Sequence, residues 1–458
     1  MQGRQEYQPE LFSIVDIEKL IPKNHLLRKI DRAVDFSFIR EMTAPLYCQD
    51  NGRPSVDPET FFRIQLLIYF YNIESDRKAC EEISYNLAYR WFCRLSLKDE
   101  VPDHSSCTKI MNRLGEETFK KIFEHIVKLC MEKGLAKGEK IMADGSLIKA
   151  DAALNSLVEK KDGDTEEDIQ AKEPPKYIIG NKYSNDTHVS KTDPDCRLAG
   201  KIGEPKQLRY KAHNIADRES RVIFDTHVTD GSVPEGTIFL KRLDEVERIF
   251  GINVLEAVAD RGYGYGENLE VLESRKINSY IPNFHEDVGD NYDRNLFKYD
   301  EKNDKFICSM GHELLPANIP SYLEYNMQMY RLLGGHCTGC PMQVKCFKGQ
   351  KVTRGKRIAR NIYWRVQAKT KEREKTEEFR KIRGERQWKM EGIFAEAKNY
   401  HGLERARYRR RHKMQIQAYM IASVQNLKRL MGALSHIFGF WLRLIPGRRK
   451  NILSQIFA

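Results

Sequence analysis

Two apolar segments of this 458-residue chain end in the same way, with an aspartate close to a glycine. The glycine follows the aspartate directly in the first segment and after one intervening residue in the second. They are KIMADG over 140–145 and VLEAVADRG over 254–262, and both read as short strands. Carboxylates at the ends of neighbouring strands repel each other unless a cation lies between them. Aspartate oxygens favour Mg²⁺ or Mn²⁺. Asp144 and Asp260 therefore predict a divalent-metal site in an α/β fold, although either Asp-Gly pair alone is also typical of an ordinary turn.

The residues around these two segments alternate between strand and helix patterns. The predicted elements are a hairpin over 206–217 and 221–230, a helix over 235–250, a strand over 278–282 and an amphipathic helix over 413–432. Gly251 ends the first of these helices. This order predicts a mixed α/β sheet with the last helix packed on it.

The N-terminal residues 1–135 are predicted to be helical. Asp57-Pro58, Ser75 and Asp103 signal helix starts, and the helix after Asp103 is expected to end near Gly115. Several short helices with tight polar turns fit a helix-turn-helix-like DNA-binding domain, and a plain helical bundle fits them equally well.

Changes in composition divide the rest of the chain. Residues 136–282 are expected to form the first part of the core, interrupted by a flexible acidic insertion over 155–206. A Cys-rich insertion follows over 283–350. A basic helical region over 351–435 completes the core, and 436–458 form a C-terminal tail.

Basic charge is concentrated in one part of the chain. Residues 345–413 hold 24 Lys and Arg against 8 Asp and Glu, a surplus of 16 in a chain of net charge +12, so the remainder carries −4. This surplus predicts a surface for a polyanion, of which nucleic acid is the commonest, and the alternative is a solvated, salt-bridged helix face. The apolar runs are short and the N-terminus lacks an apolar leader, so we expect a cytoplasmic protein with no membrane partner.

A third carboxylate is needed to complete a two-metal site, and Glu391 in the basic region is the best candidate. Lys398 follows two helical turns later, so it shares a helix face with Glu391. A carboxylate for metal and an ammonium for phosphate suit phosphodiester chemistry. Two cations about 3.5–4 Å apart would activate the attacking oxygen and stabilise the leaving one.

Four of the ten cysteines are spaced like metal ligands, and the other six are expected to be reduced thiols. The four are Cys308, Cys337, Cys340 and Cys346, and His312 or His336 could replace one sulfur. Such a set can form a tetrahedral Zn²⁺ site, here a small knuckle that positions DNA. The alternative is a thiol-rich loop that binds no metal.

Several longer motifs are specific in combination. They are IPKNHLLRKID, NGRPSVDPE, ISYNLAYRWF and VPDHSS in the N-terminal region, and ADGSLIKADA, YKAH, VADRGYG and MEGIFAEAKNYHGLERARYR in the core. With these motifs the chain resembles the DDE transposases of bacterial insertion sequences, in the branch with an InsH-type N-terminal domain. The resemblance implies an RNase H-like catalytic core with Asp144, Asp260 and Glu391 as the metal-binding triad. Asp144 would bridge both metals.

The basic region departs from related families, in which a Tyr and an Arg precede the Glu by seven and four residues. Those positions here hold Gly384 and Gln387. Arg383 and Arg386 are the nearest substitutes, and both are predicted to contact DNA.

Four further residues of this region are candidate DNA contacts. The resemblance implies that Lys398, Arg405 and Arg407 contact phosphates near the cleavage site. A generic basic surface is the alternative for the two arginines. Trp388 could stack on a base beside the cut or anchor its helix in the core.

These residues favour a transposase that binds the terminal inverted repeats of its own element and acts on target DNA. Such enzymes use water and then the freed 3′-hydroxyl to cut and rejoin double-stranded DNA. A homodimer is expected when two ends are synapsed, with the protein associated with the nucleoid. One alternative is a catalytically inactive DNA-binding protein derived from a transposase. Another, a hydrolase of sugars, conflicts with the basic segment.

Overall fold

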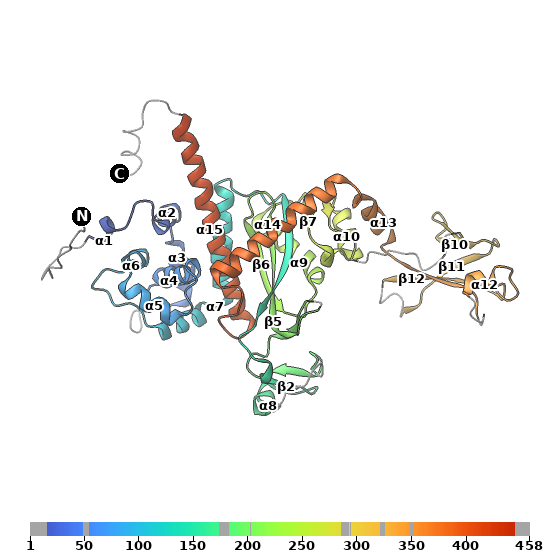
Figure 1. The fold of residues 1–458 in the computed structure, drawn as a ribbon, viewed down its shortest axis with the longest axis horizontal. Helices are drawn as coiled ribbons and strands as arrows, with labels where there is room; N and C mark the ends of the chain where they lie inside the picture. The colour runs from blue at the N-terminus through green and yellow to red at the C-terminus, as the bar shows by residue number, and fades with distance from the viewer. Residues whose placement is uncertain are drawn as a thin grey trace, which may run out of the picture.

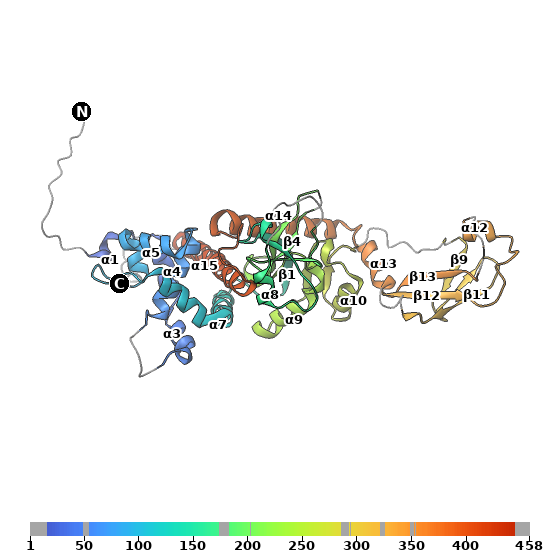
Figure 2. The ribbon, with the colours of Figure 1, turned by 90° about the horizontal axis from the view of Figure 1, so that it is seen from below.

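The computed structural model places three regions in a row along the longest axis of the molecule, as both views show (Figures 1 and 2). N-terminal helices lie at one end, the main sheet lies in the middle and a second, outlying sheet lies at the other end. The described residues are 16–48, 55–173, 183–201, 203–284, 293, 295–320, 326–348, 352 and 354–444, with side chains described as far as 434.

The N-terminal region is helical, as predicted. Its α-helices are α1 (Ile17–Leu20), α2 (Leu26–Ala33), α3 (Phe38–Thr43), α4 (Pro58–Phe70), α5 (Asp76–Tyr85), α6 (Leu87–Phe92) and α7 (His104–Glu132). The side chains of Asp57, Ser75 and Asp103 accept hydrogen bonds from backbone amides of the first turns of α4, α5 and α7. The expected helix end near Gly115 is confirmed, because Gly115 has non-helical backbone angles (φ 68°, ψ 172°). A second helical segment follows it directly, and the two together form the kinked α7, which continues to Glu132.

The central sheet combines an antiparallel half with a parallel half. Its strands are β1 (Lys140–Lys149), β4 (Arg197–Ala199), β5 (Gln207–Asp217), β6 (Ile223–Asp230), β7 (Glu256–Val258) and β8 (Asn278–Tyr280). One edge of β5 pairs antiparallel with β6 and β4, and its other edge pairs antiparallel with β1. β7 and β8 then follow parallel to β1. This arrangement confirms the expected RNase H-like mixed sheet.

Four helices are associated with the sheet: α9 (Phe239–Phe250), α10 (Gly266–Ser274), α14 (Glu377–His401) and α15 (Arg411–Leu444). α15 runs between the N-terminal helices and the sheet (Figure 1) and contacts α7 and β6. The Asn426 side chain donates to the Ile223 carbonyl and accepts from its amide, both at 2.8 Å. Gln415 bonds the Val228 amide and the Thr226 carbonyl in the same way. These buried amides satisfy backbone groups of β6 that pair with no strand.

The insertion over 155–206 differs from the expected flexible segment in its described residues. β2 (Leu157–Glu159) pairs with β3 (His188–Ser190), and α8 (Glu166–Ala171) begins with a capping box. Val158, Ile169 and Val189 form a small apolar cluster between these elements. The expectation also covers 174–182 and 202, which lie outside the described residues.

The outlying sheet contains the cysteine-containing segment. Its antiparallel strands are β9 (Phe297–Asp300), β10 (Lys305–Cys308), β11 (Glu313–Ala317), β12 (Met327–Leu332) and β13 (Arg357–Asn361), and α12 (Gln343–Phe347) lies between the last two in sequence. β13 therefore completes this sheet beyond position 350. α13 (Trp364–Arg373) and then α14 return the chain to the central sheet.

Candidate active site

The two strand-end aspartates meet because their strands share a register. β1 and β7 are parallel, and their last paired residues are Met142 and Val258. Asp144 and Asp260 each lie two residues beyond this pair, so they reach equivalent positions on neighbouring strands. β1 does not end at Asp144, as its sequence pattern suggested. It continues to Lys149 in pairing with β5 alone, and the shorter β7 is the strand that ends.

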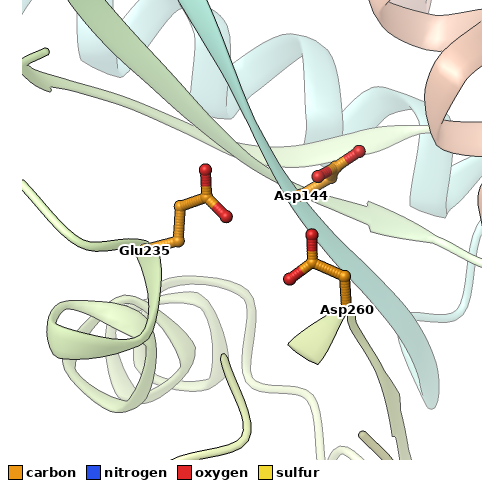
Figure 3. Close-up of side chains that lie close together, drawn as sticks. All are labelled: Asp144, Glu235 and Asp260. Carbon is orange, nitrogen blue, oxygen red and sulfur yellow. The ribbon is translucent and has the colours of Figure 1, made fainter. Parts of the chain in front are cut away.

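A third carboxylate comes from a segment that the sequence did not single out. β6 runs antiparallel to β5 and hence in the same direction as β1, so both strands lead to the same edge of the sheet. The chain beyond β6 forms a short 3₁₀ turn over Glu235–Thr237. Glu235, Asp144 and Asp260 each bring a carboxylate oxygen within 4.8 Å of the others (Figure 3). We call these three residues the carboxylate cluster.

Glycines make room for this cluster. A Cβ atom on Gly145 would stand 2.7 Å from Oε1 of Glu235. A Cβ on Gly262 would stand 3.0 Å from Oδ1 of Asp260 and 3.1 Å from Oε2 of Glu235. Because Gly145 and Gly262 have no side chains, the Glu235 side chain fits between the two strand ends.

The cluster is half-buried, and its charges repel one another. Burial raises the pKa of Asp144 to about 7; an ion pair with Arg386 at 2.6 Å opposes this, and Asp260 and Glu235 add to it. Burial also raises the pKa of Glu235, against the ammonium of Lys211 at 3.5 Å. Arg386 lies 3.7 Å from Asp260 as well. One guanidinium thus faces both aspartates, and the site favours an added cation.

Glu391 is not part of the carboxylate cluster. It lies on α14 five residues after Arg386, which places it about 140° around the helix. Arg386 faces the sheet, whereas Glu391 is exposed and accepts a hydrogen bond from Gln387 at 3.3 Å. The predicted role of Glu391 as a metal ligand stays a prediction.

A basic cavity of about 430 Å³ adjoins the carboxylate cluster: Glu235 belongs to both, and Gly145, the neighbour of Asp144, lines the cavity. Its basic lining residues are Lys149, Lys201, Arg209, Lys211 and Lys398, and its acidic ones are Glu204, Glu235 and Glu404. Burial and three of the neighbouring cations lower the pKa of Lys398, while Glu404 opposes them. Lys398 was singled out from the sequence. The other basic residues were not, because they lie in strands and a loop outside the basic segment.

The remaining candidate DNA contacts differ in whether their side chains are exposed or bonded to other parts of the protein. Arg383 is exposed on α14, and Trp388 is 57% exposed, so Trp388 does not anchor the helix in the core. Arg405 remains largely exposed while pairing with Asp151 at 2.9 Å. Arg407 bonds Asn72 and the carbonyl of Ile73, which joins the core to the turn after α4.

The four cysteines with metal-ligand spacing line one small cavity in the outlying sheet, together with His312 and His336. Among the described residues, the carboxylate cluster is the group of three or more potential ligand atoms within 4.8 Å of one another, and these cysteines are not part of such a group.

Among the described residues, no helix combines the length and the apolar character that crossing a bilayer requires.

Comparison with known proteins gives two family matches. A transposase domain (DUF772) matches residues 15–113, and a transposase DDE domain matches residues 307–431. Among curated proteins, no significant match is found. The second domain includes Glu391 and the four cysteines.

Solved transposase structures are similar at low identity. A piggyBac transposase synaptic complex with hairpin DNA is 9% identical, with 94% of this chain and 84% of that chain covered and a TM-score of 0.33. A Mos1 transposase paired-end complex with the left transposon end is 11% identical, with 51% and 61% covered and a TM-score of 0.16.

Two transposase domains match at either end of the chain, and between them an RNase H-like sheet gathers acidic side chains at one edge. The chain therefore carries two transposase domains, one of them of the DDE type, and these matches support an insertion-sequence DDE transposase.

Proposed function

We propose that this transposase binds double-stranded DNA at the terminal inverted repeats of its element, hydrolyses a phosphodiester bond there and joins the freed 3′-hydroxyl to target DNA. The observation that carries this proposal is the convergence of Asp144, Glu235 and Asp260 beside the basic cavity. The reacting phosphate lies at the carboxylate cluster, and the adjoining strand follows the cavity.

The residues of the cluster fit a divalent metal. All three donors are carboxylate oxygens, which Mg²⁺ and Mn²⁺ prefer. Burial and mutual repulsion raise the pKa values of Asp144 and Glu235, a cost that a cation removes. When bound, two such cations supply activation of the attacking oxygen and stabilisation of the leaving one. Asp144, Asp260 and Glu235 would hold them, and we propose Glu391 as the further carboxylate that would bind the second ion.

Arg386 orders the aspartates before DNA arrives. Its Nη2 atom lies 2.6 Å from Asp144, and its Nε donates to the Ala143 carbonyl at 3.3 Å. This double contact fixes α14 against β1. The arginine thus positions the cluster instead of binding DNA, which was its role in the sequence-based prediction.

DNA binding involves both the cavity and the exposed face of α14. Five basic side chains around the cavity attract phosphates, and neutralising phosphates releases their counterions. Arg383 and Arg405 extend this surface, and the exposed ring of Trp388 is available to stack on a base.

Two transposon ends require two carboxylate clusters. One cluster is present among the described residues of this chain, so we propose that two chains assemble as a homodimer on paired ends at the nucleoid. The elution volume of the complex with end DNA tests this: two chains per two ends is expected, and one chain on two ends would contradict it.

Cleavage of an end-containing duplex in Mg²⁺ tests the function. We expect nicks at the transposon end with the wild type, none in EDTA and none with Glu235→Gln. Glu391→Gln is assayed in parallel, with Glu377→Gln, an exposed carboxylate of the same helix, as the control. Full activity of Glu235→Gln together with loss in Glu391→Gln would remove Glu235 from the reaction. Equal activity in EDTA would overturn the metal-dependent mechanism.

A further inference from the structure

The outlying sheet has a small hydrophobic core of its own. Its buried members are Leu296, Phe297, Phe306, Leu314, Tyr330, Leu332, Cys337 and Ile358, and they form a cluster separate from the main core. A unit of this size seldom folds stably on so few apolar side chains without a cross-link or a metal. The four cysteines of this unit form no disulfide, so no covalent link between them supplies this stability.

Four thiols from three segments converge on one cavity of this unit. Cys308 ends β10, Cys337 and Cys340 lie in the loop after β12, and Cys346 lies in α12. The cavity has a volume of about 20 Å³, which suits one ion or one water molecule. We call these four residues the thiol cluster.

The backbone around the thiol cluster is shaped for ligands. Gly339, between Cys337 and Cys340, has a φ of 76°, and Gly311, three residues after Cys308, has a φ of 80°. Both turns need a left-handed residue, which glycine adopts without strain. The amide of Lys356 donates to Sγ of Cys337 at 3.4 Å. Hydrogen bonds of this kind to a ligand sulfur are typical of the contacts that orient ligands around a metal.

We propose that the thiol cluster binds one structural Zn²⁺ ion through Cys308, Cys337, Cys340 and Cys346. Four soft sulfur donors with no open position suit a closed tetrahedral zinc site. The ion links β10 to the loop after β12 and to α12. Among the described residues, no three of these sulfur atoms lie within 4.8 Å of one another. The sulfurs must therefore move closer together when the ion binds.

The two histidines of the cavity are not ligands in this proposal. The rings of His312 and His336 stack on each other with their centroids 4.5 Å apart. They cover the cavity instead of supplying a nitrogen. This assignment separates a four-cysteine site from a mixed site, and substitutions can distinguish the two.

Elemental analysis of the purified full chain tests the proposal. We expect about one zinc per chain in the wild type and less than about a tenth of that in Cys308→Ser and Cys340→Ser. Cys48→Ser, an exposed thiol outside the cluster, and His312→Ala are expected to retain it. Unchanged zinc in both cluster variants would overturn the site, as would a Cys337–Cys340 disulfide found by mass spectrometry. Loss of zinc from His312→Ala would overturn the four-cysteine ligand set.

A second measurement covers the case in which the cysteine variants fail to fold. Wild-type protein is stripped with a chelator and titrated with Co²⁺, and intense thiolate-to-cobalt absorption with tetrahedral visible bands is expected. Asp144→Asn is expected to give the same spectrum, because the carboxylate cluster takes no part. Absence of the thiolate bands in the wild type would overturn the proposal. This outcome is independent of DNA cleavage, so the proposed function can fail while the zinc site stands, and the reverse.

Discussion

The carboxylate cluster and the thiol cluster are built in opposite ways. The carboxylates come from distant parts of the chain, and the pairing of β5 with β1 and β6 and of β1 with β7 brings them together at one end of the sheet. The thiols come from one stretch between 308 and 346, in a sheet whose own core is small. In the first region the fold prepares the site for an ion, and in the second we propose that an ion completes the fold.

The strongest test of this contrast is Asp144→Asn. It removes a carboxylate between two strands, and we expect DNA cleavage to fall roughly 10³-fold or more, about 4 kcal/mol of transition-state stabilisation. Burial raises the pKa of Asp144 to about 7, so the metal-free variant at pH 8 is expected to unfold at an equal or higher temperature. Cleavage rate and thermal unfolding are measured on one preparation. A variant that keeps its cleavage rate, or that unfolds well below the wild type, contradicts a preformed site.

Asn426→Ala tests whether the two regions unfold separately. The variant leaves the amide and carbonyl of Ile223 unpaired, and we expect a loss of about 3 kcal/mol in the free energy of unfolding of the central sheet. Asn399→Ala, an exposed asparagine of α14, is the control. Urea unfolding by circular dichroism gives the loss, and limited proteolysis reports on β9–β13. Earlier cleavage of the outlying sheet would show that the regions are one cooperative unit.

Gly145→Ala probes the room left for Glu235. The added Cβ would stand 2.7 Å from Oε1 of Glu235, so the glutamate must move, and we expect cleavage to fall about 10–100-fold with zinc content unchanged. Gly384→Ala is the matched control, because a Cβ there meets nothing within 4 Å and alanine favours a helix. Equal activity of the two variants would mean that the position of Glu235 has no role in the reaction.

Local patterns were enough to predict part of this site. Asp144 and Asp260 each follow apolar strand residues, so the sequence alone indicated a pair at a sheet edge. Glu235 lies in a loop, and its placement depends on β6 running in the direction of β1. An acidic residue soon after a third strand of that direction is the signal that could have found it.

Helix phase and strand packing explain what the sequence did not predict. α14 was expected, but which of its residues faces the sheet depends on packing, and that residue is Arg386 instead of Glu391. The basic cavity likewise draws Lys149, Lys201 and Arg209 from strands and a loop whose charge is unremarkable in sequence. The four cysteines were recognisable because their spacing is local.

A pH comparison gives the smallest expected effect and concerns the central sheet alone. His213 in β5 pairs in register with His227 in β6, and burial lowers the pKa of His213 to about 3. The folded state therefore keeps this histidine neutral at pH 5, while the unfolded chain, with a pKa of about 6.5, binds a proton. Its contribution to stability is complete above about pH 6.5 and falls as the pH drops toward 3.

Between pH 7 and pH 5 we expect His213 to cost the central sheet about 1–2 kcal/mol of unfolding free energy. His213→Gln is expected to lose that much less over the same interval, and His188→Gln, outside the central sheet, is expected to follow the wild type. Urea unfolding of each protein at both pH values gives the difference. An identical pH dependence in His213→Gln and the wild type would show that this histidine is charged, or hydrated, in the folded protein.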